Sequence, residues 1–151
     1  MPASDYLELL GRHLDAENRH DIEDTLATLT DDCVFEDLAL GRRFEGHAGA
    51  TAYYRMWWDA FDTEVTPERL HLVEPATAVA ETTWRGKHGG PFLGIEPTGR
   101  SIEVPVILVA TSATGSWPAS ASTGIAPRCS NSWAGSRSRS RLLRRGCRLC
   151  P

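Results

Sequence analysis

Residues 69–85 read RLHLVEPATAVAETTWR, and apolar and polar side chains alternate along both halves of this stretch. A period of two is typical of a β-strand with one buried face, and Pro75-Ala76 is a turn signal between the halves. The stretch therefore predicts an antiparallel hairpin. In its second strand Trp84 shares a face with Thr82, whereas Glu81 lies on the opposite face.

The segments on either side of this hairpin complete an α+β pattern. Downstream, residues 102–110 form an apolar, β-branched run that predicts a long central strand despite Pro105. Upstream, apolar spacings of three and four predict helices over residues 6–14, 22–29 and 48–61, the second capped by Asp21. Short extended segments are predicted at 33–38 and 41–46. This order favours a cone-shaped, curved antiparallel sheet wrapped around three N-terminal helices, with a small-molecule pocket at its open end.

Length and charge limit the classes of protein that this chain can be. Its 151 residues are enough for one domain with its own core. Residues 1–110 hold nine Lys and Arg against 20 Asp and Glu, a net charge of −11 (9 minus 20), which disfavours binding to nucleic acid phosphates. Only Cys33 of the four cysteines lies there, so there is no disulfide framework. With neither a secretion signal nor a membrane-spanning apolar run, we expect a cytoplasmic protein.

Four motifs carry more specific information: NRHD at residues 18–21, DCVFED at 32–37, FEG at 44–46 and, above all, GKHGGPFLGIEPTGR at 86–100. They resemble the SnoaL-like polyketide cyclase family, which has the nuclear transport factor 2-like fold, a cystatin-like α+β barrel. The resemblance covers residues from about 6 to 110. It implies an enzyme without a cofactor, which removes a proton from an acidic carbon of a polyketide and closes a ring by aldol condensation. It also implies a homodimer formed through the outer face of the sheet.

The chain divides into a pocket domain, residues 1–110, and an atypical Arg/Ser-rich tail, residues 111–151. The tail contains seven Arg and no acidic residue. If the codons for residues 111–133 are GC-rich, dropping two bases lets the same DNA encode VRDGLVAGERLYWDRASVLEQLG, which has the turn, strand and helix expected at this place. We therefore interpret the tail as disordered or as a frameshift product, in which case the last strand of the sheet would be missing.

Three residues are candidates for catalysis: His88, Asp37 and Glu103. His88 follows a predicted strand among small neighbours that leave room for a ligand, and imidazole exchanges protons near neutral pH. The alternative is a loop histidine that orders the turn. Asp37 and Glu36 point to opposite faces of a strand, so at most one faces the pocket. The resemblance implies a carboxylate on a late strand, where Glu103 is the only acid; the family pattern has Asp.

The candidate substrate-binding set is mostly aromatic, as suits a pocket for a flat apolar molecule. Trp57 and Trp58 are consecutive in a helix, so one should be core and the other pocket or dimer interface. Core packing of the aromatic residues, solvent exposure of Glu81 and a capping role for Asn18 remain alternatives. The set comprises Asn18, Tyr54, Trp57, Trp58, Glu81, Trp84 and Phe92.

The sequence therefore predicts a cofactor-independent enzyme that closes or isomerises a small apolar or polyketide-like carbonyl compound by proton abstraction and enolate stabilisation. No metal site, nucleic acid partner or membrane partner is expected, because motifs for metal, nucleotide and serine-hydrolase chemistry are missing. Two alternatives remain open: a non-catalytic ligand-binding or dimerisation module, and an inactive truncated product.

Overall fold

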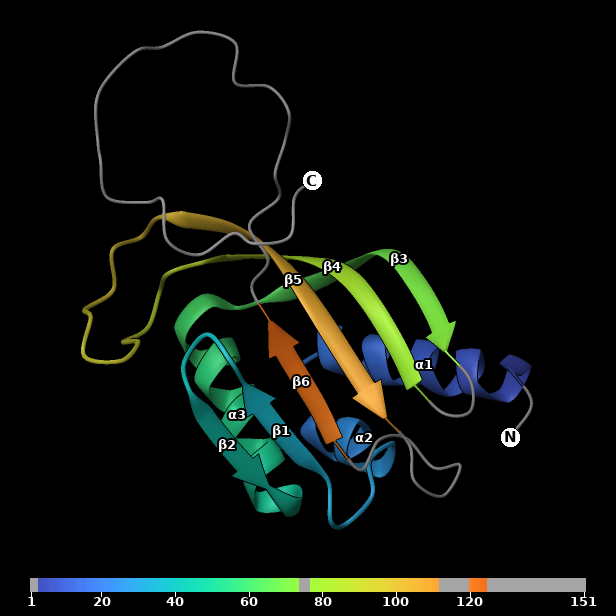
Figure 1. Cartoon of the computed structure of the whole chain (residues 1–151). Helices are drawn as coiled ribbons and strands as arrows, with labels where there is room; N and C mark the ends of the chain where they lie inside the picture. The colour runs from blue at the N-terminus through green and yellow to red at the C-terminus, as the bar shows by residue number, and fades with distance from the viewer. Residues whose placement is uncertain (1–2, 74–76, 112–119, 125–151) are drawn as a thin grey trace, which may run out of the picture.

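A computed structural model describes residues 3–73, 77–111 and 120–124, which form three helices and six strands (Figure 1). The N-terminal helices followed by a sheet confirm the α+β class, although two short strands precede the third helix. The helices are α1 (Ala3–Asn18), α2 (Ile22–Ala27) and α3 (Gly46–Phe61). The strands are β1 (Val34–Asp37), β2 (Arg42–Glu45), β3 (Glu64–Val73), β4 (Thr77–Lys87), β5 (Ser101–Thr111) and β6 (Ser120–Gly124).

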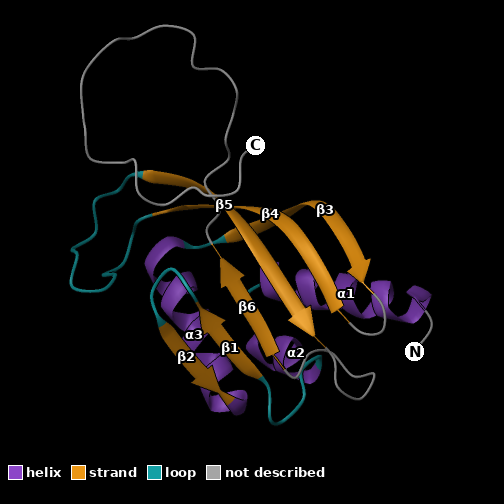
Figure 2. Cartoon of the chain, in the orientation of Figure 1, coloured by secondary structure: helices purple, strands orange, loops and turns teal. Residues whose placement is uncertain are grey.

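The six strands form one sheet in the order β2-β1-β6-β5-β4-β3. Neighbouring strands pair antiparallel except β1 and β6, which are parallel, with Val34 opposite Ser120. A long connection joins these two strands, so no tight turn forces them to be antiparallel. All three helices lie on the same side of the sheet (Figure 2). The curved sheet and its helices therefore enclose the core from two sides.

The predicted hairpin is confirmed as β3 and β4, which pair antiparallel up to Val73 opposite Thr77; its turn lies outside the described residues. The two prolines of the sheet occupy positions where a missing N–H is tolerated. Pro67 lies in the edge strand β3, next to a shift in register. Pro105 lies in the central strand β5, but β6 pairs only with residues 107–111 and does not reach it.

β6 occupies the position between β1 and β5. Residues 120–124, SASTG, belong to the predicted tail, for which a missing last strand was one expectation. The described sheet thus continues beyond residue 110. A segment without alternating apolar residues can still form a strand, because its backbone pairs with a strand on each side. The frameshift interpretation stays a prediction, and residues 125–151 lie outside the described part of the chain.

Side-chain hydrogen bonds hold the start of α2 and the end of α1 in place. Asp21 caps α2 as predicted, its Oδ1 accepting the Asp24 N–H at 3.0 Å. α1 runs to Asn18, beyond the predicted end at residue 14. There the Asn18 amide clamps the backbone of Val65 in β3, donating to its carbonyl at 2.9 Å and accepting its N–H at 2.8 Å. This clamp holds the end of α1 against the sheet.

Candidate functional site

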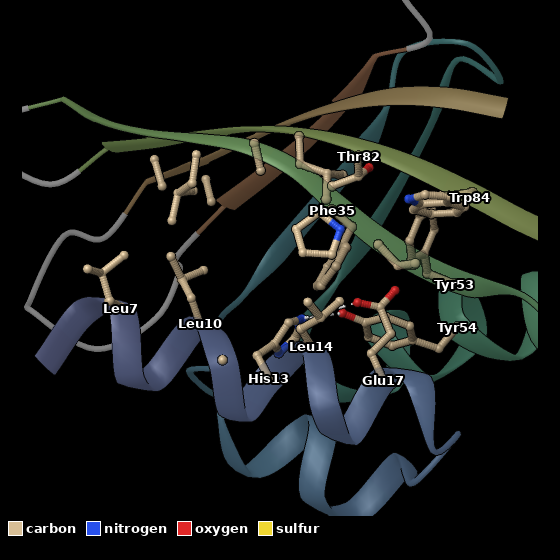
Figure 3. A pocket seen from close by; sticks show the side chains of 18 residues that line it. Leu7, Leu10, His13, Leu14, Glu17, Phe35, Tyr53, Tyr54, Thr82 and Trp84 are labelled. Atoms are coloured by element: carbon tan, nitrogen blue, oxygen red, sulfur yellow. Dashed lines mark hydrogen bonds and ion pairs between the residues drawn. The ribbon is translucent and has the colours of Figure 1, made fainter. Parts of the chain in front are cut away.

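A cavity of about 270 Å³ lies between α1, α3 and the inner face of the sheet (Figure 3). Four alternate residues of β4 contribute to its wall, which confirms the face predicted for Trp84 and Thr82. Most of the wall is apolar, and among the described residues no Lys, Arg or Asp lines it. The lining residues are Leu7, Leu10, Gly11, His13, Leu14, Glu17, Phe35, Tyr53, Tyr54, Val65, Pro67, Leu70, Ala78, Ala80, Thr82, Trp84, Leu108 and Ala110.

Three polar side chains meet at one end of this cavity: Glu17 and His13 of α1, and Tyr54 of α3. Figure 3 shows their functional groups pointing toward one another, with Leu7 and Leu10 farther along α1. The Tyr54 hydroxyl lies 3.0 Å from His13 Nε2, and Glu17 Oε2 lies 3.9 Å from the same nitrogen. His13 Nδ1 lies 2.6 Å from the hydroxyl of Thr28. We refer to Glu17, His13 and Tyr54 as the cavity triad.

Burial shifts the proton affinity of each member of the triad. It raises the pKa of Glu17 to about 7 and lowers that of His13 to about 4. It also raises the pKa of Tyr54 well above its usual value, and the Glu17 charge adds to this rise. Near neutral pH the imidazole and the phenol are therefore uncharged. Glu17 is then present both as carboxylic acid and as carboxylate, as a group that gives and takes protons requires.

The two large shifts have opposite effects on stability as pH changes. The raised pKa of Glu17 makes the folded chain bind more protons than the unfolded chain between about pH 4.5 and 7, so this contribution to stability falls as pH rises. The lowered pKa of His13 makes the folded chain bind fewer protons between about pH 4 and 6.5, so its contribution rises with pH. Over the shared range the two contributions oppose each other.

We therefore expect Glu17→Gln, which keeps only the His13 contribution, to gain stability relative to the wild type as pH rises from 4.5 to 7. The expected gain is about 3 kcal/mol over this range. Urea unfolding of both chains at several pH values measures it. A stability difference between the two chains that does not change with pH would contradict the raised pKa.

Tyr54 and Trp84 are the two residues of the predicted site that line the cavity. Trp57 packs behind Trp84, with ring centroids 5.2 Å apart. Trp58 stacks on Tyr54 at 5.2 Å from the core side. Phe92 contacts the Trp57 ring at 5.0 Å. These three residues support the wall but do not form it.

The predicted carboxylates lie away from the cavity and from one another. Asp37 is buried, and its Oδ1 accepts the Leu40 N–H at 2.9 Å in the turn after β1. Glu103 is exposed and pairs with Arg85 at 3.2 Å. Glu81 lies on the outer face of β4 near Arg69, at 3.7 Å. Their positions favour structural contacts over proton transfer in the cavity.

His88 is buried in the loop that follows β4, outside the cavity lining. Its ring stacks on Phe61 at 4.9 Å, and its Nδ1 lies 3.1 Å from Thr98 Oγ1 and 3.3 Å from the Thr98 nitrogen. These contacts agree with the loop-ordering alternative, whereas Nε2 is buried with no hydrogen-bond partner among the described residues. The neighbouring Gly90 packs so closely against α3 that an added Cβ would collide with the Asp59 carbonyl oxygen. The catalytic roles of His88, Asp37 and Glu103 stay predictions.

Glu17 and His13 are not among the site residues that the sequence predicts. The signal was present, because Leu10, Leu14 and Glu17 follow one another at helical spacings of four and three. Ending the helix at residue 14 left Glu17 in a loop and hid a carboxyl aligned with an apolar stripe. As for metal ions, the described residues contain no group of three or more His, Cys, Asp or Glu placed to hold one.

The chain has the nuclear transport factor 2-like or ketosteroid isomerase-like fold, with a cavity inside it. The family model of the SnoaL-like domain matches residues 10–118, and the chain belongs to this family. The resemblance seen in the sequence is thereby confirmed. None of the curated proteins matches this sequence. Within the described residues, no helix is long and apolar enough to cross a membrane.

Solved structures with similar folds include three instructive cases. TsrD from Streptomyces laurentii is 26% identical, with 82% of this chain and 90% of that chain covered and a TM-score of 0.70. A protein from Jannaschia sp., provisionally named a SnoaL-like polyketide cyclase, is 24% identical, with coverages of 78% and 83% and a TM-score of 0.69. A hypothetical protein from Catenulispora acidiphila with a ketosteroid isomerase-like fold, solved with trimethylamine, is 14% identical, with coverages of 78% and 84% and a TM-score of 0.65.

Proposed function

We propose that this chain is a cofactor-independent enzyme that isomerises or cyclises a small, neutral, apolar carbonyl compound by proton transfer. The observation that carries the proposal is a carboxyl group, Glu17, whose burial in an apolar cavity raises its pKa to about 7. A carboxylate deprived of water is a stronger base than one in solution. The names of the family and of its structural relatives support the same class of chemistry.

In the proposed reaction the Glu17 carboxylate takes a proton from the carbon next to the carbonyl. The electron pair of the broken C–H bond moves into the carbonyl group, which becomes an enolate. The carboxylic acid formed on Glu17 then returns its proton to the enolate oxygen or to another carbon, which completes an isomerisation. If the enolate carbon instead attacks a second carbonyl in the same molecule, a C–C bond closes a ring and the new alkoxide takes the proton.

The cavity walls favour such a substrate over charged ones. Phe35, Tyr53 and Trp84 supply aromatic surface, and the described part of the lining contains no Lys or Arg to pair with a carboxylate or phosphate. A neutral, largely apolar body is therefore the best match. The proposal assigns proton transfer to Glu17 because His88, Asp37 and Glu103 do not line the cavity. The homodimer expected from the resemblance remains part of the proposal.

Hydrogen–deuterium exchange of phenylacetone tests the proposal without knowledge of the natural substrate. This aryl ketone is neutral and carries acidic hydrogens next to its carbonyl. We expect the protein to accelerate loss of these hydrogens in heavy water above the buffer rate, as followed by proton NMR. Binding of phenylacetone in the cavity with exchange no faster than in buffer would contradict the enzyme and favour a ligand-binding module.

A further inference from the structure

The hydrogen of the Tyr54 hydroxyl has a fixed direction, set by a chain of hydrogen bonds that begins outside the cavity. The Thr28 hydroxyl lies 2.6 Å from the Thr25 carbonyl oxygen. A carbonyl has no hydrogen, so this short contact requires Thr28 to donate its own. The Thr28 oxygen can then only accept from His13 Nδ1, at 2.6 Å. His13 therefore carries its proton on Nδ1.

This assignment determines the role of Tyr54. Neutral His13 with its proton on Nδ1 presents a lone pair at Nε2. The Tyr54 hydroxyl, 3.0 Å away, must donate its hydrogen there. Its oxygen lone pairs remain for a ligand, because Tyr54 lines the cavity. Tyr54 thus offers an acceptor and not a donor.

A second hydroxyl group of the cavity wall, that of Thr82, behaves in the same way. Thr82 lines the cavity and donates its hydrogen to the Val106 carbonyl at 3.0 Å. The Trp84 N–H does not supply a donor, because its Nε1 atom is covered by neighbouring atoms. Tyr54, Thr82 and Trp84 thus offer no hydrogen to a ligand, whereas the acid form of Glu17 does. At Tyr54 and Thr82 the cavity wall therefore presents acceptors.

We propose that the substrate carries a hydroxyl group, as an enol, phenol or alcohol, that donates to the Tyr54 oxygen, and that Thr28 is the positioning residue that sets this preference through His13. A carbonyl alone would meet oxygen lone pairs on both Tyr54 and Thr82, which is unfavourable. The proposal deepens the proposed function, on which it rests, by naming the substrate class as hydroxylated carbonyl compounds. Its test uses ligands that do not react. A failure of this binding preference can therefore be told apart from a failure of the proposed proton transfer.

Three ligands of similar size separate donors from acceptors: phenol donates, toluene does neither, and benzonitrile accepts. In the wild type we expect phenol to bind about tenfold more tightly than toluene, the effect of one buried hydrogen bond. Benzonitrile should gain nothing over toluene. Equal affinities of phenol and benzonitrile for the wild type would overturn the proposal.

Thr28→Val removes the acceptor for His13 Nδ1 while keeping the shape of the side chain. The imidazole should then move its proton to Nε2 and donate to Tyr54, whose hydroxyl hydrogen becomes free to point at the ligand. We expect the ratio of phenol to benzonitrile affinity to fall by about tenfold or more. The matched control is Thr25→Val, since Thr25 is fully buried in α2, just before Thr28, but its hydroxyl donates to the Asp21 carbonyl.

If Thr28→Val folds and its ratio of phenol to benzonitrile affinity equals that of Thr25→Val, the positioning role of Thr28 is refuted. If Thr28→Val does not fold, nitrogen NMR of the wild type decides, because it reports which ring nitrogen of His13 carries the proton. A proton on Nδ1 together with the phenol preference supports the proposal, and a proton on Nε2 overturns it. Deuterium exchange of phenylacetone tests Glu17 independently of either result.

Discussion

Glu17→Gln is expected to slow the deuterium exchange of phenylacetone by about 10²- to 10⁴-fold, the usual contribution of a general base. Glutamine has nearly the same shape as glutamate but cannot take up a proton. The chain should still fold, because the buried carboxyl is already half in its neutral acid form near pH 7. Affinity for toluene in the cavity should change little, since the apolar wall is intact.

The matched control for this variant is Glu8→Gln, which alters an exposed carboxylate of the same helix that does not line the cavity. Its exchange rate should equal that of the wild type. The wild-type rate should also rise with pH through about 7, as the carboxylate form of Glu17 accumulates. A Glu17→Gln chain that folds, binds ketone and exchanges at the wild-type rate would show that another group is the base.

Gly90→Ala is expected to cause the largest loss of stability among single methyl additions in the loop between β4 and β5. A Cβ atom at this position would collide with the backbone carbonyl oxygen of Asp59, and its distance to the Ala60 Cα would be 3.3 Å. Both contacts are with the backbone of α3, which cannot move aside as a flexible side chain can. The Gly90 N–H also donates to the Ala60 carbonyl at 3.1 Å, so the loop cannot shift without losing this bond.

We expect Gly90→Ala to cost about 3 kcal/mol or more, at the upper end of the range for overpacked sites. Gly89→Ala is the control, because its added Cβ would have an ordinary contact, 3.7 Å from the Lys87 oxygen. That variant should stay within about 0.5 kcal/mol of the wild type. Thermal and urea unfolding of the two variants measure the difference. Equal stability would mean that α3 and the loop are not packed as described.

The secondary structure of the core could be predicted because local signals were strong. The alternation through residues 69–85 and the Asp21 cap are properties of short stretches, and both are confirmed. β6 could not be predicted in this way, since residues 120–124 are small and have no apolar period. Its position depends on pairing with β1, which is distant in sequence, as well as with the preceding strand β5.

The cavity was harder to predict than the fold because it depends on packing between distant elements. Trp84 and Tyr54 were identified, since aromatic residues on an inner face tend to line a pocket. His88 and Gly90 look like a ligand loop in sequence, but the space beside them is taken by the end of α3. Glu17 is hard to recognise from sequence, because a carboxylate near a helix end is usually solvated. In the structure the Glu17 side chain is buried where α1 packs under the sheet.

The position of β6 also bears on the order in which the chain can fold. In the described sheet, β6 supplies the hydrogen bonds that join the hairpin of β1 and β2 to β5, β4 and β3, while α3 packs against both parts. Bringing Val34 alongside Ser120 closes a long loop, so we expect this pairing to be a slow step of folding. A short segment of small residues is thus expected to complete the sheet late in folding.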